Sequence, residues 1–278
     1  MDLVFTSPPY EKARSYGIGF SLEGQDWVDW CVAWWRECSR VSRGLVAAVV
    51  EGRTKQFRWS ATPALLMADL HRAGIRLRKP PIYQRVGIPG SGGPDWLRND
   101  WEFVVCSSKG RLPWSENTAM GHPPKWAPGG AMSHRLSDGT RRNQWGGSAG
   151  GKSQRSRKQD GRLDGGKRPS HLTLTKQEAP DGYQPPVKAN PGNIVSCKVG
   201  GGLMGSKLAH ANEAPFPEAL AEFFIRSFCP PGGLVVDPFC GSGTTLKVAL
   251  QHGRRAIGID VRESQVELTR RRVEEALG

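Results

Sequence analysis

Apolar residues recur at helical spacing between Asp26 and Arg43, near the start of the chain. Asp26 is placed to cap this helix and Gly44 to end it. The apolar stripe consists of Trp27, Trp30, Cys31, Trp34, Cys38 and Val41. Because the stripe follows one side of the helix, we interpret its tryptophans as core residues rather than as base-stacking residues.

Short apolar runs on either side of this helix predict buried strands. The run from Leu3 to Phe5 ends at two prolines, which cannot continue a hydrogen-bonded ladder. The run from Leu45 to Val50 is continuous, as in a parallel strand that is covered on both faces. The pattern then predicts a helix from Thr62 to Ala73, an interrupted strand from Ile75 to Val86 and a strand from Trp101 to Cys106. This alternation of strands and helices indicates an α/β fold.

The same alternation returns near Ala214. An amphipathic helix is predicted to open at Pro217. Its apolar face consists of Phe216, Leu220, Phe223, Phe224 and Phe228. Then come a strand from Leu234 to Asp237, a glycine-rich turn, a helix from Thr244 to Gln251 and a strand from Ala256 to Asp260. This is a βαβ unit in which an acidic residue ends each strand.

The stretch between Lys125 and Lys176 shows neither the apolar spacing of a helix nor the apolar run of a buried strand. It holds twelve Lys or Arg residues against three acidic residues, with repeated Gly, Ser and Gln and almost no aliphatic residues. Such a composition cannot build a core of its own, so we interpret the stretch as an insertion. We therefore divide the chain into a first half-domain at 1–108, a basic insertion at 109–192 and a second half-domain at 193–278.

The charge balance points to a polyanionic partner. Across 278 residues, 39 Lys and Arg stand against 26 Asp and Glu, which gives a formal net charge of +13, and such a field attracts phosphate backbones. No apolar run is long enough to span a bilayer and no leader-like segment opens the sequence, so we expect a cytoplasmic protein without a membrane partner. The six cysteines form no Cys-x-x-Cys pair, so neither a metal site nor a disulfide scaffold is predicted.

The glycine-rich turn after Asp237 predicts a nucleoside pocket. Gly241 and Gly243 would let the backbone approach a ligand closely, and Asp260 at the end of the next strand could hold both hydroxyls of a ribose. The full G-x-G-x-x-G spacing of dinucleotide enzymes and the Gly-Lys-Ser/Thr of a phosphate loop are absent, which disfavours NAD and ATP. On spacing alone, a purely structural turn stays open as the alternative.

Two strings of residues resemble the motifs of one enzyme family. The string Asp237-Pro238-Phe239-Cys240-Gly241-Ser242-Gly243-Thr244-Thr245 resembles the cofactor loop of the S-adenosylmethionine-dependent DNA amino-methyltransferases. The string Thr6-Ser7-Pro8-Pro9-Tyr10 resembles their catalytic loop. His210 and the run Ala214-Pro215-Phe216-Pro217-Glu218 resemble the segment that lines the methionine end of the cofactor in that family. A catalytic loop that precedes the cofactor loop is the order of the circularly permuted β class.

This resemblance implies a Rossmann-like class I methyltransferase sheet that is circularly permuted and mostly parallel. It also implies S-adenosyl-L-methionine as the cofactor and double-stranded DNA as the partner, as in restriction-modification enzymes. The implied catalytic residues are Ser7, Pro8, Pro9 and Tyr10. The implied cofactor-binding residues are Asp237, Phe239, Gly241, Ser242, Gly243, Thr244, Asp260, Pro215 and Phe216. Residues 1–108 are then the catalytic half, 193–278 the cofactor-binding half and 109–192 the candidate target-recognition region.

The chain departs from this family at its start. Members usually carry about one strand and helix before the catalytic strand, whereas this sequence opens at Asp2 directly before Leu3. We therefore expect a sheet that lacks one strand, which a homodimer or a second chain could complete. A catalytically weak or inactive DNA-binding homologue is the alternative from another functional class.

The catalytic-loop residues suit transfer to an exocyclic amine. The lone pair of such an amine is delocalised into the base, so hydrogen-bond acceptors must hold the amine protons and draw the lone pair out of conjugation. Ser7 Oγ and the Pro8 carbonyl can be these acceptors. Tyr10 can stack on a base that has been extruded from the duplex. Methylation at carbon 5 of cytosine needs a cysteine that follows a proline, and no Pro-Cys dipeptide occurs. In this family, the residue directly before the two prolines is more often Ser in cytosine enzymes and more often Asp in adenine enzymes. Ser7 at this position therefore favours cytosine N4 as the target, with adenine N6 as the alternative.

Overall fold

The computed structural model describes residues 1–12, 18–87, 92–123, 187–199 and 215–277. The chain divides into two units, one of Met1–Met120 with Asn190–Gly278 and one of Gly121–Ala189. Only the ends of the second unit are described, and there His122 and Ala189 form an antiparallel bridge. The basic stretch from Lys125 to Lys176 and His210 lie outside the described residues.

The first unit is built on a mixed sheet of eight strands in the order β10-β9-β1-β2-β7-β6-β8, with β5 paired to β7 off this path. Its strands are β1 (Leu3–Thr6), β2 (Leu45–Val50), β5 (Leu77–Arg78), β6 (Ile82–Val86), β7 (Trp101–Ser107), β8 (Ile194–Lys198), β9 (Leu234–Asp237) and β10 (Arg255–Gly258). Strand β7 is antiparallel to each of its neighbours, and the other pairs are parallel. The predicted α/β, mostly parallel fold is therefore confirmed.

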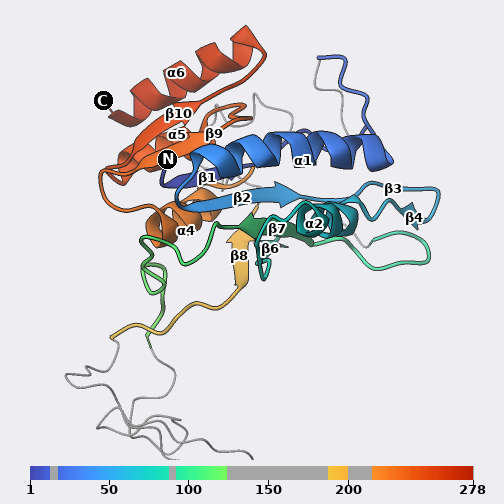
Figure 1. Ribbon diagram of the computed structural model, residues 1–278, viewed down its shortest axis with the longest axis horizontal. Coiled ribbons are helices and arrows are strands. Elements are labelled where there is room, and N and C mark those ends of the chain that lie inside the picture. Colours follow the sequence, from blue (N-terminus) through green and yellow to red (C-terminus); the bar gives the residue numbers. More distant parts are fainter. Residues whose placement is uncertain (13–17, 88–91, 124–186, 200–214, 278) are drawn as a thin grey trace, which may run out of the picture. The chain divides into compact units, whose positions relative to one another are not determined.

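Helices cover both faces of this sheet (Figure 1). The helices α1 (Gly24–Val41) and α2 (Thr62–Arg72) pack on one face, α4 (Glu218–Phe228) and α5 (Thr244–Gln251) pack on the other, and α6 (Glu263–Leu277) contacts α5. In β1, Leu3 and Phe5 face α4 and α5, whereas Val4 faces α1 and α2. This two-sided burial explains why the central strands read as continuous apolar runs. No helix in the described part of the chain has the length and apolar character needed to cross a bilayer.

The predicted elements are present, with small shifts at their ends. Helix α1 begins at Gly24, so its N-cap residue is Glu23 and not the predicted Asp26. Pro217 is the N-cap residue of α4 rather than its first helical residue. Strand β10 ends at Gly258, so Asp260 follows the strand instead of ending it.

The tryptophan stripe of α1 is buried only in part. Trp27 is fully buried, as predicted, and so is Trp35, which the predicted stripe did not include. Trp30 and Trp34 are half-buried. The buried face of the helix is therefore rotated toward Trp35, and Trp30 stands at the border of the core.

The two loops that carry the motifs meet at one edge of the sheet. From β9 the chain passes through α5 to β10 on one side, and from β1 it passes through α1 to β2 on the other. The crevice at the carboxyl ends of β9 and β1 is thus a topological switch point, where ligands of open α/β sheets bind. A two-stranded hairpin, β3 (Thr54–Lys55) with β4 (Arg58–Trp59), follows β2 at the same edge (Figure 1).

The strands on either side of the insertion are β7 and β8. Strand β7 ends at Ser107 beside Val46, at the start of β2. Strand β8 begins at Ile194 beside Ile82, which pairs with Phe103 and is therefore level with Val50, at the end of β2. The role of 109–192 in target recognition stays a prediction. Strand β10 is an edge strand of the described sheet. The pairing of a second chain with this edge strand, which would complete the sheet, also stays a prediction.

Candidate active site

A cavity of about 970 Å³ opens at the switch point. The predicted residues that line it, eleven in all, are Ser7, Pro8, Pro9, Tyr10, Pro215, Phe216, Phe239, Gly241, Ser242, Thr244 and Asp260. They come from the two ends of the sequence, and the pairing of β1 with β9 brings them together. The fold thus unites the two loops that the sequence singled out separately.

Two predicted cofactor residues, Asp237 and Gly243, are not among the lining residues. The carboxylate of Asp237 lies beneath the loop, where its Oδ1 accepts hydrogen bonds from Thr6 Oγ1 at 2.5 Å and from the Phe239 amide at 3.1 Å. Burial raises the pKa of Asp237 to about 6. Gly243 has a φ of +77°, and a Cβ there would lie 2.7 Å from Thr269 Cγ2. In this structure both residues shape the loop from behind.

The loop after β1 is fixed on both sides of Pro8. Ser7 Oγ donates to the Val49 carbonyl at 3.4 Å, and the indole nitrogen of Trp27 donates to the Pro9 carbonyl at 2.8 Å. In the described part of the chain, no hydrogen bond reaches the Pro8 carbonyl. Two acceptors therefore stay available in the loop, the lone pairs of Ser7 Oγ and the carbonyl oxygen of Pro8.

Glu11, the residue directly after the motif, anchors the end of this loop. It is 2% exposed. Its Oε2 accepts a hydrogen bond from the Gly24 amide at 2.9 Å, and its Oε1 accepts from the Arg53 amide at 3.0 Å and from Thr62 Oγ1 at 3.1 Å. A single carboxylate thus joins the catalytic loop to the starts of α1 and α2 and to the segment after β2. Sequence reasoning missed this role, since nothing in a lone Glu indicates three distant donors.

The far wall of the cavity carries charged residues that the motifs did not indicate. Tyr10 Oη donates to Glu102 Oε2 at 2.7 Å, and Glu102 forms an ion pair with Arg85 at 3.3 Å. All three side chains belong to residues that line the cavity. The ring of Tyr10, predicted to stack on a base, is therefore held in position through its hydroxyl.

Glu51 follows β2 directly and lines the same cavity. Its Oε1 accepts hydrogen bonds from the Trp59 indole at 3.0 Å and from the Gly52 amide at 2.8 Å. No hydrogen bond from the described residues reaches Oε2. Burial raises the pKa of this carboxyl group. The position could have been found from the sequence, because neighbouring parallel strands end at the same edge of a sheet.

The cofactor half of the cavity is organised by Asp260. Its Oδ2 accepts a hydrogen bond from the Gly241 amide at 3.0 Å and its Oδ1 accepts one from the Arg262 amide at 2.9 Å. Each carboxylate oxygen has a second lone pair, so ribose hydroxyls can still be bound. Phe239 stands beside this loop with its ring 5.4 Å from Trp30 and 5.3 Å from Trp34, measured between ring centroids. Trp30 also lines the cavity, so its role is not confined to the core.

A fully buried arginine supports the cofactor loop from α6. Arg272 donates hydrogen bonds to Ser242 Oγ at 3.0 Å, to Thr244 Oγ1 at 2.8 Å and to the Ser242 carbonyl at 3.3 Å. It also forms an ion pair with Glu218 at 2.7 Å. Because Ser242 and Thr244 line the cavity, the wall that would face the cofactor depends on this arginine.

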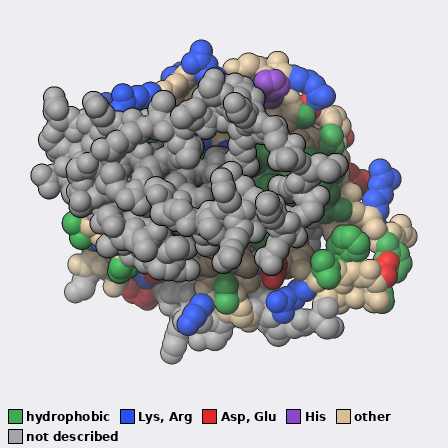
Figure 2. Space-filling model, turned by 90° about the horizontal axis from the view of Figure 1, so that it is seen from below, with side chains coloured by type: hydrophobic (Ala, Val, Ile, Leu, Met, Phe, Trp, Pro, Cys, Tyr) green, Lys and Arg blue, Asp and Glu red, His purple; other side chains and the backbone are tan. Residues whose placement is uncertain are grey.

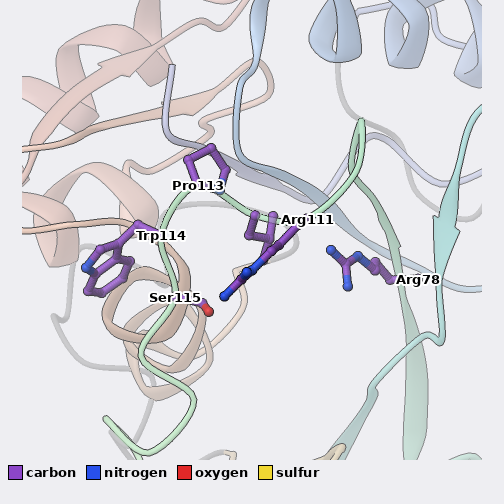
Figure 3. Close-up of a pocket in the computed structure, with 6 residues that line it drawn as sticks. Arg78, Arg111, Pro113, Trp114 and Ser115 are labelled. Carbon is purple, nitrogen blue, oxygen red and sulfur yellow. The ribbon is translucent and has the colours of Figure 1, made fainter.

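A second cavity, of about 640 Å³, lies at the other edge of the sheet. Figure 3 shows the guanidinium groups of Arg78 and Arg111 turned toward this space, with the indole of Trp114 pointing away from them. Arg78 donates to Ser108 Oγ at 2.9 Å and is thereby fixed next to the end of β7. None of the residues predicted for chemistry line this cavity, so the larger cavity is the candidate active site.

Lys and Arg side chains are visible on one face of the molecule (Figure 2). On the face seen in Figure 2, Lys and Arg side chains lie at several places around the margin, with apolar side chains between them. The distribution of charge on this face therefore does not by itself mark a site, and the assignment rests on the residues of the larger cavity.

A sequence model of the DNA methylase family, N6_N4_Mtase, matches residues 1–271 of the chain. The chain belongs to this DNA methylase family. The orphan methyltransferase M.BamHII of Bacillus amyloliquefaciens is 26% identical over 280 residues, covering 98% of this chain and 88% of that protein.

Solved structures of DNA methylases have the same fold. The PvuII DNA methyltransferase (cytosine-N4-specific) matches with a TM-score of 0.61 at 19% identity, covering 100% of this chain and 83% of that one. TTHA0409 of Thermus thermophilus, in complex with S-adenosyl-L-methionine, matches with a TM-score of 0.52 at 21% identity, covering 99% and 85%. The predicted class I methyltransferase architecture is thereby confirmed.

The family uses S-adenosyl-L-methionine as its methyl donor, and the residues present fit this cofactor. The volume of about 970 Å³ is at the upper end of the range of small-molecule sites, which leaves room for a nucleoside and a base. Asp260 and Gly241 line this cavity; the binding of a ribose by the Asp260 carboxylate, and the close approach of the cofactor to the backbone at Gly241, stay predictions. Membership therefore confirms the predicted cofactor and makes the chain a DNA methyltransferase of the N4/N6 class.

Proposed function

We propose that this DNA methyltransferase methylates the exocyclic N4 of a cytosine that has been extruded from duplex DNA. The observation that carries the proposal is that Ser7 and Pro8 line the same cavity as Gly241 and Asp260. One space would thus hold both the base and the methyl donor. Because the reacting groups would be held side by side, proximity supplies much of the rate.

Two acceptors of the catalytic loop would prepare the amine. Ser7 directs its hydroxyl hydrogen toward the Val49 carbonyl, so the lone pairs of Oγ can accept one amine proton while the Pro8 carbonyl accepts the other. Held in this way, the nitrogen lone pair is drawn out of conjugation with the ring. The cofactor, when bound, supplies a methyl group on a positively charged sulfur.

The opposite wall would hold the base and take up the released proton. The ring of Tyr10, fixed by Glu102, can stack on the extruded base. After transfer the amine carries an extra proton, and Glu51 offers an oxygen, Oε2, that has no described donor. The raised pKa of Glu51 suits such an acceptor, because general bases work best near the operating pH.

Adenine N6 is the second candidate, because the name of the matched family covers both N6 and N4 amines. What supports cytosine is Ser7 in the first position of the catalytic motif. The deciding experiment is to incubate DNA with the enzyme and S-adenosyl-L-methionine, digest it to nucleosides and identify the product by mass. N4-methyldeoxycytidine is expected. N6-methyldeoxyadenosine would move the proposal to adenine. If no methylated nucleoside is found, the chain is instead a DNA-binding homologue without activity.

The variant Ser7→Ala tests the proposed role of the hydroxyl. It removes one preorganised hydrogen-bonding group, and such groups contribute about 2–4 kcal/mol to transition-state stabilisation, so turnover should fall roughly 30- to 1,000-fold. Cofactor affinity should not change, since the loop at Gly241 is untouched. Ser196→Ala, in the exposed part of β8, is the matched control. A Ser7→Ala enzyme with wild-type turnover would refute the assigned mechanism.

A further inference from the structure

The hairpin formed by β3 and β4 carries an exposed aromatic residue at its tip. Thr54 pairs with Trp59 and Lys55 with Arg58, so only Gln56 and Phe57 form the turn. The side chain of Phe57 is 76% exposed. Single exposed apolar residues are common on protein surfaces, and Trp96 is as exposed, at 78%, so exposure alone assigns no role to Phe57.

The turn is strained in a way that keeps this ring at the tip. Gln56 and Phe57 have φ values of +49° and +62°, as the type I′ turn of a two-residue hairpin requires at both positions. Asn and Gly are the residues that favour this geometry, whereas a bulky aromatic residue rarely adopts it. Strained backbone of this kind clusters at active sites, ligand clamps and switch regions.

The base of the hairpin is rigid and lies at the mouth of the active site. Arg53 and Thr54 line the catalytic cavity. The ring of Trp59 stacks on that of Phe103 with centroids 6.5 Å apart, and its indole donates to Glu51. The Arg53 carbonyl accepts a hydrogen bond from the Ser60 amide at 3.0 Å, which closes the base of the hairpin.

The charge around the tip suits a phosphate backbone. Arg53, Lys55 and Arg58 surround the turn, and none of them forms an ion pair with a described residue. At about 3.3 Å per strand residue, the tip extends at most about 10 Å beyond Thr54. That reach matches the depth of the major groove, about 8.5 Å.

We propose that the hairpin inserts Phe57 into duplex DNA at the target base pair, where the ring occupies the space that the extruded base leaves. This inference rests on the proposed function, which needs a base taken out of the stack. Apolar side chains that enter base steps are a known way to hold DNA in an unstacked form. The cations would contact the flanking phosphates, while the extruded base enters the cavity bounded by Thr54 and Ser7.

The test compares two DNA duplexes that contain a site methylated by the wild-type enzyme. One has the target base paired normally, and the other has it opposite an abasic position, where extrusion is easier. The variant is Phe57→Asn, because Asn favours positive φ and therefore preserves the turn while it removes the ring. Methyl transfer from labelled cofactor should fall tenfold or more on the paired duplex and stay within about threefold of wild type on the abasic duplex.

The control variant is Ile194→Thr, which removes apolar surface from a residue that is 61% exposed at the start of β8 and does not line the cavity. It should change neither rate. If Phe57→Asn leaves both rates unchanged, or lowers both by the same factor, the wedge is overturned. If the wild-type enzyme produces no methylated nucleoside from DNA, no such site can be chosen and the proposed function itself fails, so the two failures are distinguishable.

Discussion

Replacing Arg272 with methionine is expected to lower the free energy of unfolding by about 3 kcal/mol and to weaken the binding of S-adenosyl-L-methionine. The guanidinium group is 0% exposed, and removal of one partner from a buried ion pair costs about 3–5 kcal/mol because the other charge is left uncompensated. Here Glu218 keeps a second partner, Lys247 at 2.7 Å, and its side chain is 21% exposed. These two features place the expected loss at the lower end of the range.

The substitution also removes the hydrogen bonds that Arg272 donates to the wall of the active site. Without the guanidinium group, the Ser242 carbonyl and the hydroxyl of Thr244 lose a buried donor, and a buried acceptor without a partner is unfavourable. The loop can regain partners only by moving, and it lines the cavity. Affinity for the cofactor should therefore fall together with stability.

Urea unfolding followed by circular dichroism measures the first effect, and calorimetric titration with S-adenosyl-L-methionine measures the second. Arg271→Met is the matched control, because Arg271 is the neighbouring residue of the same helix and is exposed. Its effect should be within about 0.5 kcal/mol. An Arg272→Met protein with wild-type stability and wild-type cofactor affinity would refute the role given to this side chain.

Two further substitutions test how the central loops are supported. Burial raises the pKa of Asp237 from 3.8 to about 6; the folded state therefore retains a proton that the unfolded state releases, and stability should fall as pH rises between about 4 and 6. Asp237→Asn should remove this dependence and be more stable by about 3 kcal/mol at pH 8 in thermal unfolding, and equal pH profiles for the two proteins would contradict this. Trp27→Phe keeps the apolar bulk but loses the hydrogen bond to the Pro9 carbonyl. Turnover should therefore fall roughly 2- to 10-fold, while cofactor affinity stays unchanged. Turnover equal to that of the wild type would show that this hydrogen bond is dispensable.

The sequence pattern predicts the central strands well because their burial on both faces leaves a local signal. Leu45–Val50 is apolar throughout, and the structure buries every residue of it. The ends of α1 and β10 were less predictable, since caps depend on a few polar contacts. The two loops were found because their residues form contiguous strings, which a single sequence can display.

The far wall of the site could not be read in the same way. Glu102 lies at the amino end of a strand that runs antiparallel to its neighbours, and Arg85 lies on the next strand. They meet Tyr10 only because β7 and β6 follow β2 in the sheet, and strand order is not encoded in local pattern. Arg272 was missed for a related reason. It follows Arg270 and Arg271 in a polar helix, and its burial depends on acceptors from other elements.

The pairing of β1 with β9 determines how late the centre of the sheet is completed during synthesis. Thr6 and Asp237, which are hydrogen bonded, are 231 residues apart in the chain. At 5–20 residues per second, roughly 12–46 s pass between their incorporation at the ribosome. During that interval β1 can pair with β2 on one side, while the backbone groups on its other side await β9. An open strand edge is a template for pairing with other chains, so the strand that is made first is the one whose mispairing a nascent chain must avoid for longest.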